Sequence, residues 1–330
     1  MMMSGVMIRR LATVVTGLAL SLVLNGASRA DDTRLTVMVF RGGQNLPLFA
    51  AQTKGFFAKR GLSVESVFAP SADALAPGLA SGRLQIIHST ADNAIKIADV
   101  DKLDVALVVG GDNAHNHIIA QQDIRSLADL RGKTIVLDTA TSGYAYVLYA
   151  ILKRHGLNRG DYVLKNVGAT PRRLEAMLTD KNNKAAMLNP PFSIQAVNAG
   201  LKDMGSTVSM MGAYQGPAGY TLRSWAKANS DTVVKYLQSY IEGVRWTLDP
   251  ANKDEATRIL ADRLELTPDV AAAVYAVVTD KAEGFARDGK FDMEGFKNVL
   301  DLRTEYEGGA PVDPQKDLDL SYYQRALAGL

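Results

Sequence analysis

Short apolar runs, polar loops and helix-periodic stretches follow one another along most of the chain. Residues 133–137 include the apolar run 135–137, which is typical of a buried strand in a parallel sheet. The polar loop 138–143 follows, and residues 144–152 then carry apolar side chains at helical spacing. The first N–H groups of a helix have no partner within the helix and are free to bind a ligand. We therefore predict a ligand-binding site where this strand, polar loop and helix start meet.

The same arrangement occurs earlier in the chain. An expected strand over 35–40 leads into a polar loop over 41–47 and a helix from Leu48 to about Lys59. Both helices end in a basic last turn followed by a glycine, Gly61 in the first copy and Gly156 in the second. Further strands and helices continue each copy: 64–68, 73–80, 84–88 and 103–109 in the first, and 162–167, 172–178 and 185–188 in the second. We therefore predict an α/β fold with two similar lobes and ligand loops at the strand ends.

The chain is expected to pass between the lobes twice. Residues 117–121 read as an extended crossing into the second lobe, and residues 208–214 read as the return. Two crossings make a hinge of two strands. From Ser224 onward the pattern is helical, and we expect this block to pack on the first lobe. Lobe 1 would then consist of residues 31–118 and 215–330, and lobe 2 of residues 119–214.

The first thirty residues have the pattern of an export signal. Arg9 and Arg10 precede an apolar run over 11–24, which is too short to span a bilayer. Ser28 and Ala30 supply small residues for cleavage after Ala30, so we expect the mature protein to be exported, with the periplasm as its location. An uncleaved anchor is the alternative. The absence of cysteine excludes disulfides and lipid attachment at the cleavage site.

Composition changes this picture little. The 330 residues are 47% hydrophobic, which suits about two domains with sizeable cores. The 37 basic residues are balanced by 35 acidic ones without a charge run, so we expect no nucleic-acid partner.

Candidate ligand contacts are polar and aromatic residues in the loops at strand ends. They are Gln44, Asn45, Leu46, Ser89, Thr90, Asn113, His115, Thr141, Ser142, Tyr144, Asn189 and Phe192. Amide, hydroxyl and helix-terminal N–H groups would orient a solute, and the aromatic rings would supply apolar faces. For each residue the alternative is a cap or turn position outside the pocket; Ser142 and Asn45 are the strongest candidates. Arg41 would pair with a carboxylate or sulfonate if it faced the cleft, but a solvated surface position is favoured.

Signatures of catalysis and metal binding are weak. The chain has no G-x-S-x-G, no H-E-x-x-H and no cysteine nucleophile. Lys133 and Thr134 imitate the end of a P-loop, but Leu127 stands where its first glycine is required. His115 and His117 would face one side of a strand, yet a third metal ligand is lacking. We expect no catalytic residue, no metal and no cofactor.

Four stretches, 50–62, 79–84, 126–135 and 189–191, resemble type II periplasmic solute-binding proteins of ABC importers. The chain is most similar to the nitrate/sulfonate/taurine-type family, which also contains binding proteins for thiamine pyrimidine precursors. The resemblance implies a monomeric clamp that captures a small organic or anionic solute, such as a sulfonate, nitrate, an aromatic acid or a pyrimidine. It also implies ABC permease subunits of the inner membrane as partners. Two alternatives remain open: an exported or substrate-consuming enzyme on this fold, similar to pyrimidine-precursor synthases, and a ligand-loaded sensor partner.

Overall fold

The computed structural model describes residues 32–112, 115–309 and 313–330. The predicted signal segment therefore lies outside the described residues, as does Asn113. No helix in the described ranges is long and apolar enough to cross a membrane.

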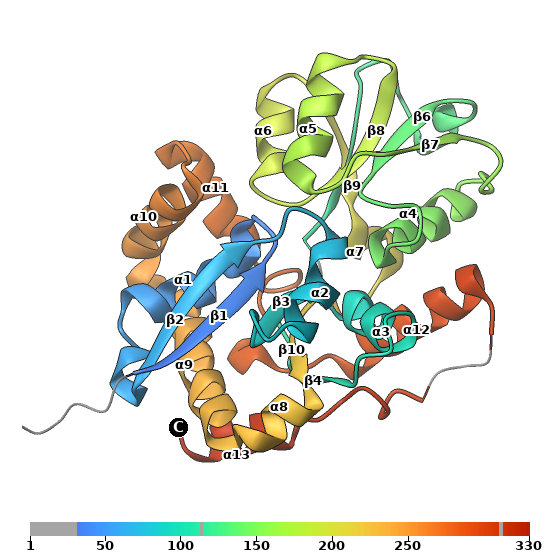
Figure 1. The fold of residues 1–330 in the computed structure, drawn as a ribbon. Coiled ribbons are helices and arrows are strands. Elements are labelled where there is room, and N and C mark those ends of the chain that lie inside the picture. Colours follow the sequence, from blue (N-terminus) through green and yellow to red (C-terminus); the bar gives the residue numbers. More distant parts are fainter. Residues whose placement is uncertain (1–31, 113–114, 310–312) are drawn as a thin grey trace, which may run out of the picture. The chain divides into compact units, whose positions relative to one another are not determined.

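Two five-stranded sheets form the framework (Figure 1). The first has the order β2-β1-β3-β10-β4 and contains β1 (Thr33–Val39), β2 (Leu62–Phe68), β3 (Ile86–Thr90), β4 (Val105–Val109) and β10 (Pro217–Leu222). The second has the order β7-β6-β8-β5-β9 and contains β5 (His117–Ala120), β6 (Thr134–Leu137), β7 (Val163–Asn166), β8 (Asn183–Leu188) and β9 (Lys202–Ser206). The prediction of an α/β fold is confirmed.

Each sheet is completed by a strand that arrives from the other. Strand β5 follows β4 along the chain and pairs antiparallel with β8 and β9, whereas β10 follows β9 and pairs antiparallel with β3 and β4. The predicted crossing at 117–121 is thus strand β5. The return crossing was expected over 208–214 as an extended segment, but the chain forms helix α7 (Thr207–Met211) there. The Ser206 side chain caps this helix, and the chain then enters β10. The two crossings are joined by the Thr207 N–H, which donates to the Asn116 carbonyl at 2.8 Å.

Most predicted helices are present with shifted ends. The helices between strands are α1 (Leu46–Thr53), α2 (Leu75–Ala80), α3 (Ala91–Asp99), α4 (Gly143–Arg154), α5 (Thr170–Thr179) and α6 (Phe192–Asn198). Helix α1 ends before the predicted Lys59, because Gly55 turns the chain with a φ of 71°. Gly61 and Gly156 take the left-handed conformation after a helical turn, as predicted, with φ of 69° and 79°.

The C-terminal part is helical: α8 (Arg223–Ala228), α9 (Ser230–Leu248), α10 (Lys253–Leu264), α11 (Pro268–Val278), α12 (Met293–Glu307) and α13 (Ser321–Ala328). Helix α9 packs closely on α1. A Cβ atom at Gly243 of α9 would lie 2.2 Å from the Pro47 carbonyl oxygen, so glycine is needed for this approach. The fully buried Phe49 and Tyr236 fill the layer between these helices and the first sheet.

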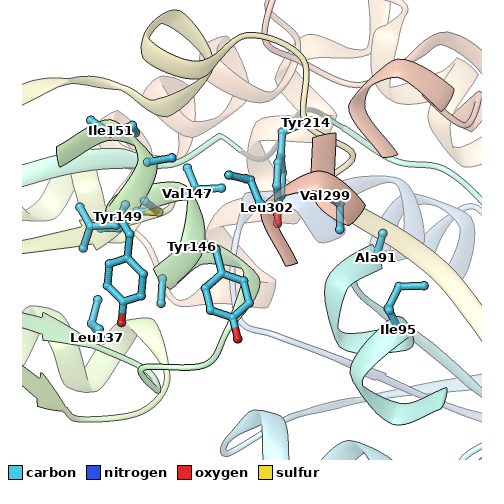
Figure 2. Packing of buried hydrophobic residues seen from close by; sticks show 14 of the residues in the cluster. Ala91, Ile95, Leu137, Tyr146, Val147, Tyr149, Ile151, Tyr214, Val299 and Leu302 are labelled. Carbon is cyan, nitrogen blue, oxygen red and sulfur yellow. The ribbon is translucent and has the colours of Figure 1, made fainter. Parts of the chain in front are cut away.

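Helix α12 of the C-terminal block reaches beyond the first lobe, on which the block was expected to pack. This helix contacts both α3 and α4. Figure 2 shows Ile95 of α3, Tyr146 of α4 and Val299 of α12 in one buried cluster. The reason lies in α4, in which every residue from Ala145 to Leu152 is buried. One sheet covers one face of a helix, so α4 needs a second partner.

An ion pair lies inside this three-helix contact. Arg303 of α12 donates from Nη1 to Asp92 of α3 at 2.8 Å and from Nη2 to Glu307 at 2.6 Å. The side chain of Asp92 is fully buried and that of Arg303 is 4% exposed. Helix α4 begins against the same carboxylate, because a Cβ atom at Gly143 would lie 2.5 Å from the Cβ atom of Asp92.

Replacing Asp92 with Asn should lower the free energy of unfolding by about 3–5 kcal/mol, because it leaves the Arg303 charge buried without its principal counter-ion. Urea unfolding at neutral pH measures this loss. The matched control is Asp301→Asn, which removes the exposed pair with Lys297 and should cost less than about 1 kcal/mol. Equal losses in the two variants would contradict a structural role for the buried pair.

Candidate functional site

A small cavity lies where strand ends of both sheets come together. Its volume is about 70 Å³, and one water molecule needs about 10–15 Å³ on this measure. Its walls come from the segments that follow β1, β3, β4, β6, β7 and β8 and from the start of β10. The lining residues are Phe40, Gln44, His88, Ser89, Thr90, Asn93, Asp112, His115, Asn116, Asp138, Ser142, Gly143, Tyr144, Ala169, Thr170, Arg173, Asn189 and Pro217. This is the position in which open α/β sheets hold ligands.

Seven of the twelve residues predicted from the sequence line this cavity: Gln44, Ser89, Thr90, His115, Ser142, Tyr144 and Asn189. They come from both sheets. Whether they contact a solute stays a prediction, and Asn113 lies outside the described residues.

Four predicted residues lie away from the cavity. Asn45 donates from Nδ2 to the Phe40 carbonyl at 2.7 Å, so its amide holds the turn after β1. Leu46 is fully buried in the core of the first sheet, and Phe192 packs in the core beneath the second. Thr141 is exposed and borders a different surface depression. These placements favour the cap, turn and core interpretations for the four residues.

Arg41 also points elsewhere. Its Nη2 donates to the Leu264 carbonyl at 2.7 Å, and its guanidinium lies 5.2 Å from the ring centroid of Phe68. The end of α10 and the end of β2 therefore hold this cation outside the cavity.

The cation that lines the cavity is Arg173, which sequence reasoning missed. It lies in the first turn of α5 and is 5% exposed. Its Nη2 donates to Thr170 Oγ1 at 2.6 Å, and it forms no ion pair with any described residue. Burial lowers the pKa of the Arg173 guanidinium below its usual value. Arg173 follows strand β7, so the same rule that selected the other strand-end loops would have found it.

Three buried side-chain nitrogen atoms in the described chain have no hydrogen-bond partner, and their residues all line this cavity. They are Nε of Arg173, Nδ2 of Asn116 and Nε2 of His115. The first two can only donate, whereas the imidazole nitrogen donates or accepts according to its protonation. Buried donors without acceptors are costly and uncommon. Their convergence predicts a bound group that accepts hydrogen bonds.

The loop after β6 is held in shape from within. Ser142 caps α4 by accepting from the Ala145 N–H at 3.2 Å and donates to Asp138 Oδ1 at 2.6 Å. The Thr139 N–H donates to the same carboxylate oxygen at 2.6 Å. The hydroxyl of Ser142 is therefore engaged in the loop, although its residue borders the cavity.

His88 forms an uncharged part of the wall. Its ring centroid lies 4.7 Å from that of Tyr240, and its Nε2 lies 2.9 Å from the Tyr236 hydroxyl. Burial lowers the pKa of His88 to about 3. The imidazole is therefore neutral across the physiological range.

The two histidines considered as metal ligands lie beside different carboxylates. His115 Nδ1 lies 3.5 Å from Asp112 Oδ1 at the cavity, whereas His117 Nδ1 lies 2.8 Å from Asp203 Oδ2 in strand β9. Over the described ranges no group of three or more His, Asp or Glu side chains is arranged to hold a metal ion.

The lowered pKa of His88 makes stability depend on pH. The unfolded chain takes up a proton near pH 6.5 and the folded chain only near pH 3, so stability falls as pH drops through this window. Between pH 7 and pH 5 the free energy of unfolding should fall by about 2 kcal/mol from this group alone. Urea unfolding at both pH values tests this, and a His88→Gln variant should lack that share of the loss. NMR detection of a protonated His88 imidazole in the folded protein at pH 5 would contradict the assignment.

Comparison with solved structures identifies the fold to which this chain is similar. The nitrate-binding protein NrtA from Synechocystis PCC 6803 has 16% sequence identity and a TM-score of 0.76, covering 90% of this chain and 89% of that chain. The periplasmic aliphatic sulphonate-binding protein SsuA from Escherichia coli has 16% identity and a TM-score of 0.70, covering 88% and 99%. The desulfurization enzyme DSZB has 10% identity and a TM-score of 0.63, covering 90% and 99%. These likenesses show the periplasmic binding protein fold.

No curated protein sequence gives a significant match. A family model does, that of the NMT1-like family, and it matches residues 28–261, which is more than half of the chain. The fold, the cavity at its strand ends and this match agree. The chain belongs to the NMT1-like family.

Proposed function

We propose that this protein is the solute-binding component of an ABC importer. The observation that carries the proposal is the small cavity built from strand ends of both sheets, in which the buried guanidinium of Arg173 forms no ion pair with a described residue. Proteins of the same fold are named as nitrate-binding and sulphonate-binding proteins, which supports the same role here. The predicted export signal would deliver the protein to the periplasm, where it would act as a monomer.

Capture would work by closure of two lobes. The first lobe would consist of residues 31–118 and 215–330, the second of residues 119–214, and the two crossings would act as the hinge. A solute that contacts His88 of the first lobe and Arg173 of the second stabilises the closed state, because an open protein offers it only one of them. The permease would then recognise closure rather than the solute.

We assign the structure to the closed state on the basis of hydrogen bonds beside the cavity. The Gly43 N–H donates to the Pro190 carbonyl at 3.0 Å, and Asn189 Nδ2 donates to Gln44 Oε1 at 3.3 Å. Both contacts join the loop after β1 to the loop after β8. These hydrogen bonds would break when the lobes separate. Solute binding and the hydrogen bonds between the loops therefore both favour the closed state.

Binding without turnover is the expected activity, in spite of an enzyme among the proteins of this fold. A guanidinium keeps its proton in proteins, so Arg173 would hold an anion but not exchange protons with it. Native mass spectrometry of the purified protein distinguishes the two activities. A binding protein releases the captured compound with unchanged mass, whereas a substrate-consuming enzyme yields product.

The test variant is Arg173→Met in the mature chain that begins at Asp31. The wild-type protein should show a melting temperature that rises with the logarithm of solute concentration, in a screen of carboxylates, sulfonates, nitrate and pyrimidines. Arg173→Met should weaken binding by at least about 30-fold, which corresponds to about 2 kcal/mol or more. The unliganded variant should be as stable as the wild type or more stable, because a buried unpaired charge is removed.

The matched control is Arg172→Met, the exposed neighbour on the same helix, which should bind as the wild type does. If Arg173→Met binds the solute as tightly as the wild type does, the solute does not bind in this cavity. Failure of native mass spectrometry and of the whole solute screen to detect binding would overturn the proposed function.

A further inference from the structure

A second pocket lies where the segment 279–292, between α11 and α12, meets the start of α10. Its volume is about 600 Å³, whereas that of the cavity described above is about 70 Å³. We infer that the second pocket binds an organic anion that carries a flat apolar ring and is too large for the cavity. Such a compound would be an effector, because the pocket is lined by residues next to both crossings, Gly111 and Gln215. The inference goes beyond the proposed function and does not depend on it.

The rim of the second pocket is positively charged. Four of its exposed residues are cations that form no ion pair with a described residue: Lys253, Lys281, Arg287 and Lys290. Like charges that line one pocket repel one another, so an anion held among them is favoured.

The carboxylates at the second pocket are already engaged by the protein. Asp280 Oδ1 accepts from two backbone N–H groups of its own turn, at 2.8 and 3.0 Å, and these bonds lower the pKa of Asp280. Asp292 Oδ1 accepts from a backbone N–H in the first turn of α12 at 3.1 Å. Asp112 is only 4% exposed. The cations remain in excess even when all three carboxylates are counted, so the rim favours a negatively charged ligand.

One wall of the second pocket is apolar. It consists of Leu248, Pro250 and the aromatic side chains of Tyr275 and Phe285. An inorganic anion would contact the cations but leave this wall in water, and a neutral apolar molecule would leave the cations unused. A ring that bears an acid group matches both parts, and pockets for small organic ligands have volumes of about 300–1,000 Å³.

Two paired backbone segments lie between the second pocket and the cavity. Asp112 and Phe285 face each other in an antiparallel bridge, and the Ala286 N–H donates to the Gly111 carbonyl at 3.0 Å. Asp112 lines both sites. The ring of Phe285 lies edge-on to that of His115, with centroids 5.9 Å apart, and His115 lines the cavity. A ligand in the second pocket would therefore border the same wall as a solute in the cavity.

The segment that forms the second pocket also holds the return crossing. The Asp292 N–H donates to Gln215 Oε1 at 2.7 Å, and Ser206 Oγ donates to Glu283 Oε1 at 2.7 Å. Ser206 caps α7, the helix with which that crossing begins. A ligand that fixes the segment 279–292 would therefore stabilise both crossings in their present arrangement, and binding at the two sites would be coupled.

The test uses three probes on the mature protein. They are 2-naphthoate, 2-naphthamide, which keeps the ring without the charge, and acetate, which keeps the charge without the ring. Calorimetry should show 2-naphthoate binding at least about ten-fold more tightly than either of the others. Equal or tighter binding of 2-naphthamide would contradict the role of the cations, and equal or tighter binding of acetate would contradict the role of the apolar wall. If 2-naphthoate does not bind at all, the inference is wrong.

Matched variants connect the result to the second pocket. Ala282→Glu places a carboxylate at its rim and should weaken 2-naphthoate at least about ten-fold, whereas Ala272→Glu, on the exposed face of α11, should not. Arg287→Gln combined with Lys290→Gln should weaken it at least about five-fold, and the exposed Arg258→Gln should leave it unchanged. Undiminished binding by Ala282→Glu would refute the assignment, because a loss of fold could only weaken binding.

Two further measurements separate this site from the cavity and test its effector role. Arg173→Met should bind 2-naphthoate as the wild type does. Loss of binding there, with retention in Ala282→Glu, would place the probe in the cavity and overturn the inference without touching the proposed function. Hydrogen exchange of the backbone of α7 should slow when 2-naphthoate binds to the wild type and stay unchanged in Ala282→Glu. Unchanged exchange in the wild type at saturating 2-naphthoate would exclude the effector role.

Discussion

The exchange of one strand between the two sheets is the constraint on which the site depends. Strands β5 and β10 each complete the sheet that the chain has just reached, and each runs antiparallel to its neighbours. The chain can leave one sheet and complete the other only through short crossings, so the loops at the carboxyl ends of the parallel strands are brought to a common place. A cavity lined from six strand ends follows from this connectivity.

Two kinds of contact join the segments around the first sheet to those around the second sheet: an apolar contact between helices, and hydrogen bonds between loops. Helices α3, α4 and α12 share buried aromatic and aliphatic side chains and the pair of Asp92 with Arg303 (Figure 2). The loops after β1 and β8 are joined instead by hydrogen bonds, of which the Gly43 N–H to the Pro190 carbonyl is one. An apolar contact with a buried ion pair costs more to separate than a few hydrogen bonds that water can replace. The helical contact is therefore the stronger of the two.

The environment of Arg173 departs from the rules that govern a stable core. A buried guanidinium without a counter-ion destabilises the folded state, and a hydrophobic residue of similar size would not. Asp92 and Arg303 are equally buried but form an ion pair at 2.8 Å, so each charge has a counter-ion. Of these two buried arginines, Arg173 forms no ion pair with a described residue, and it is the one that we propose to contact a solute.

The sequence by itself determined the local elements, the duplicated order of strands and helices, the crossing at β5, the glycines that end helical turns and the family resemblance. These features depend on residues a few positions apart, and the period of apolar side chains reports them directly. Only the tertiary structure decided that Gln44 rather than Asn45 borders the cavity, that Arg173 rather than Arg41 supplies its cation, and that α12 covers α4. Neighbouring polar residues in a loop look alike in the sequence. Contacts with elements more than a hundred residues away along the chain decide which of them faces the cavity. The contacts of Asn189 with Gln44 and of Arg41 with Leu264 are examples.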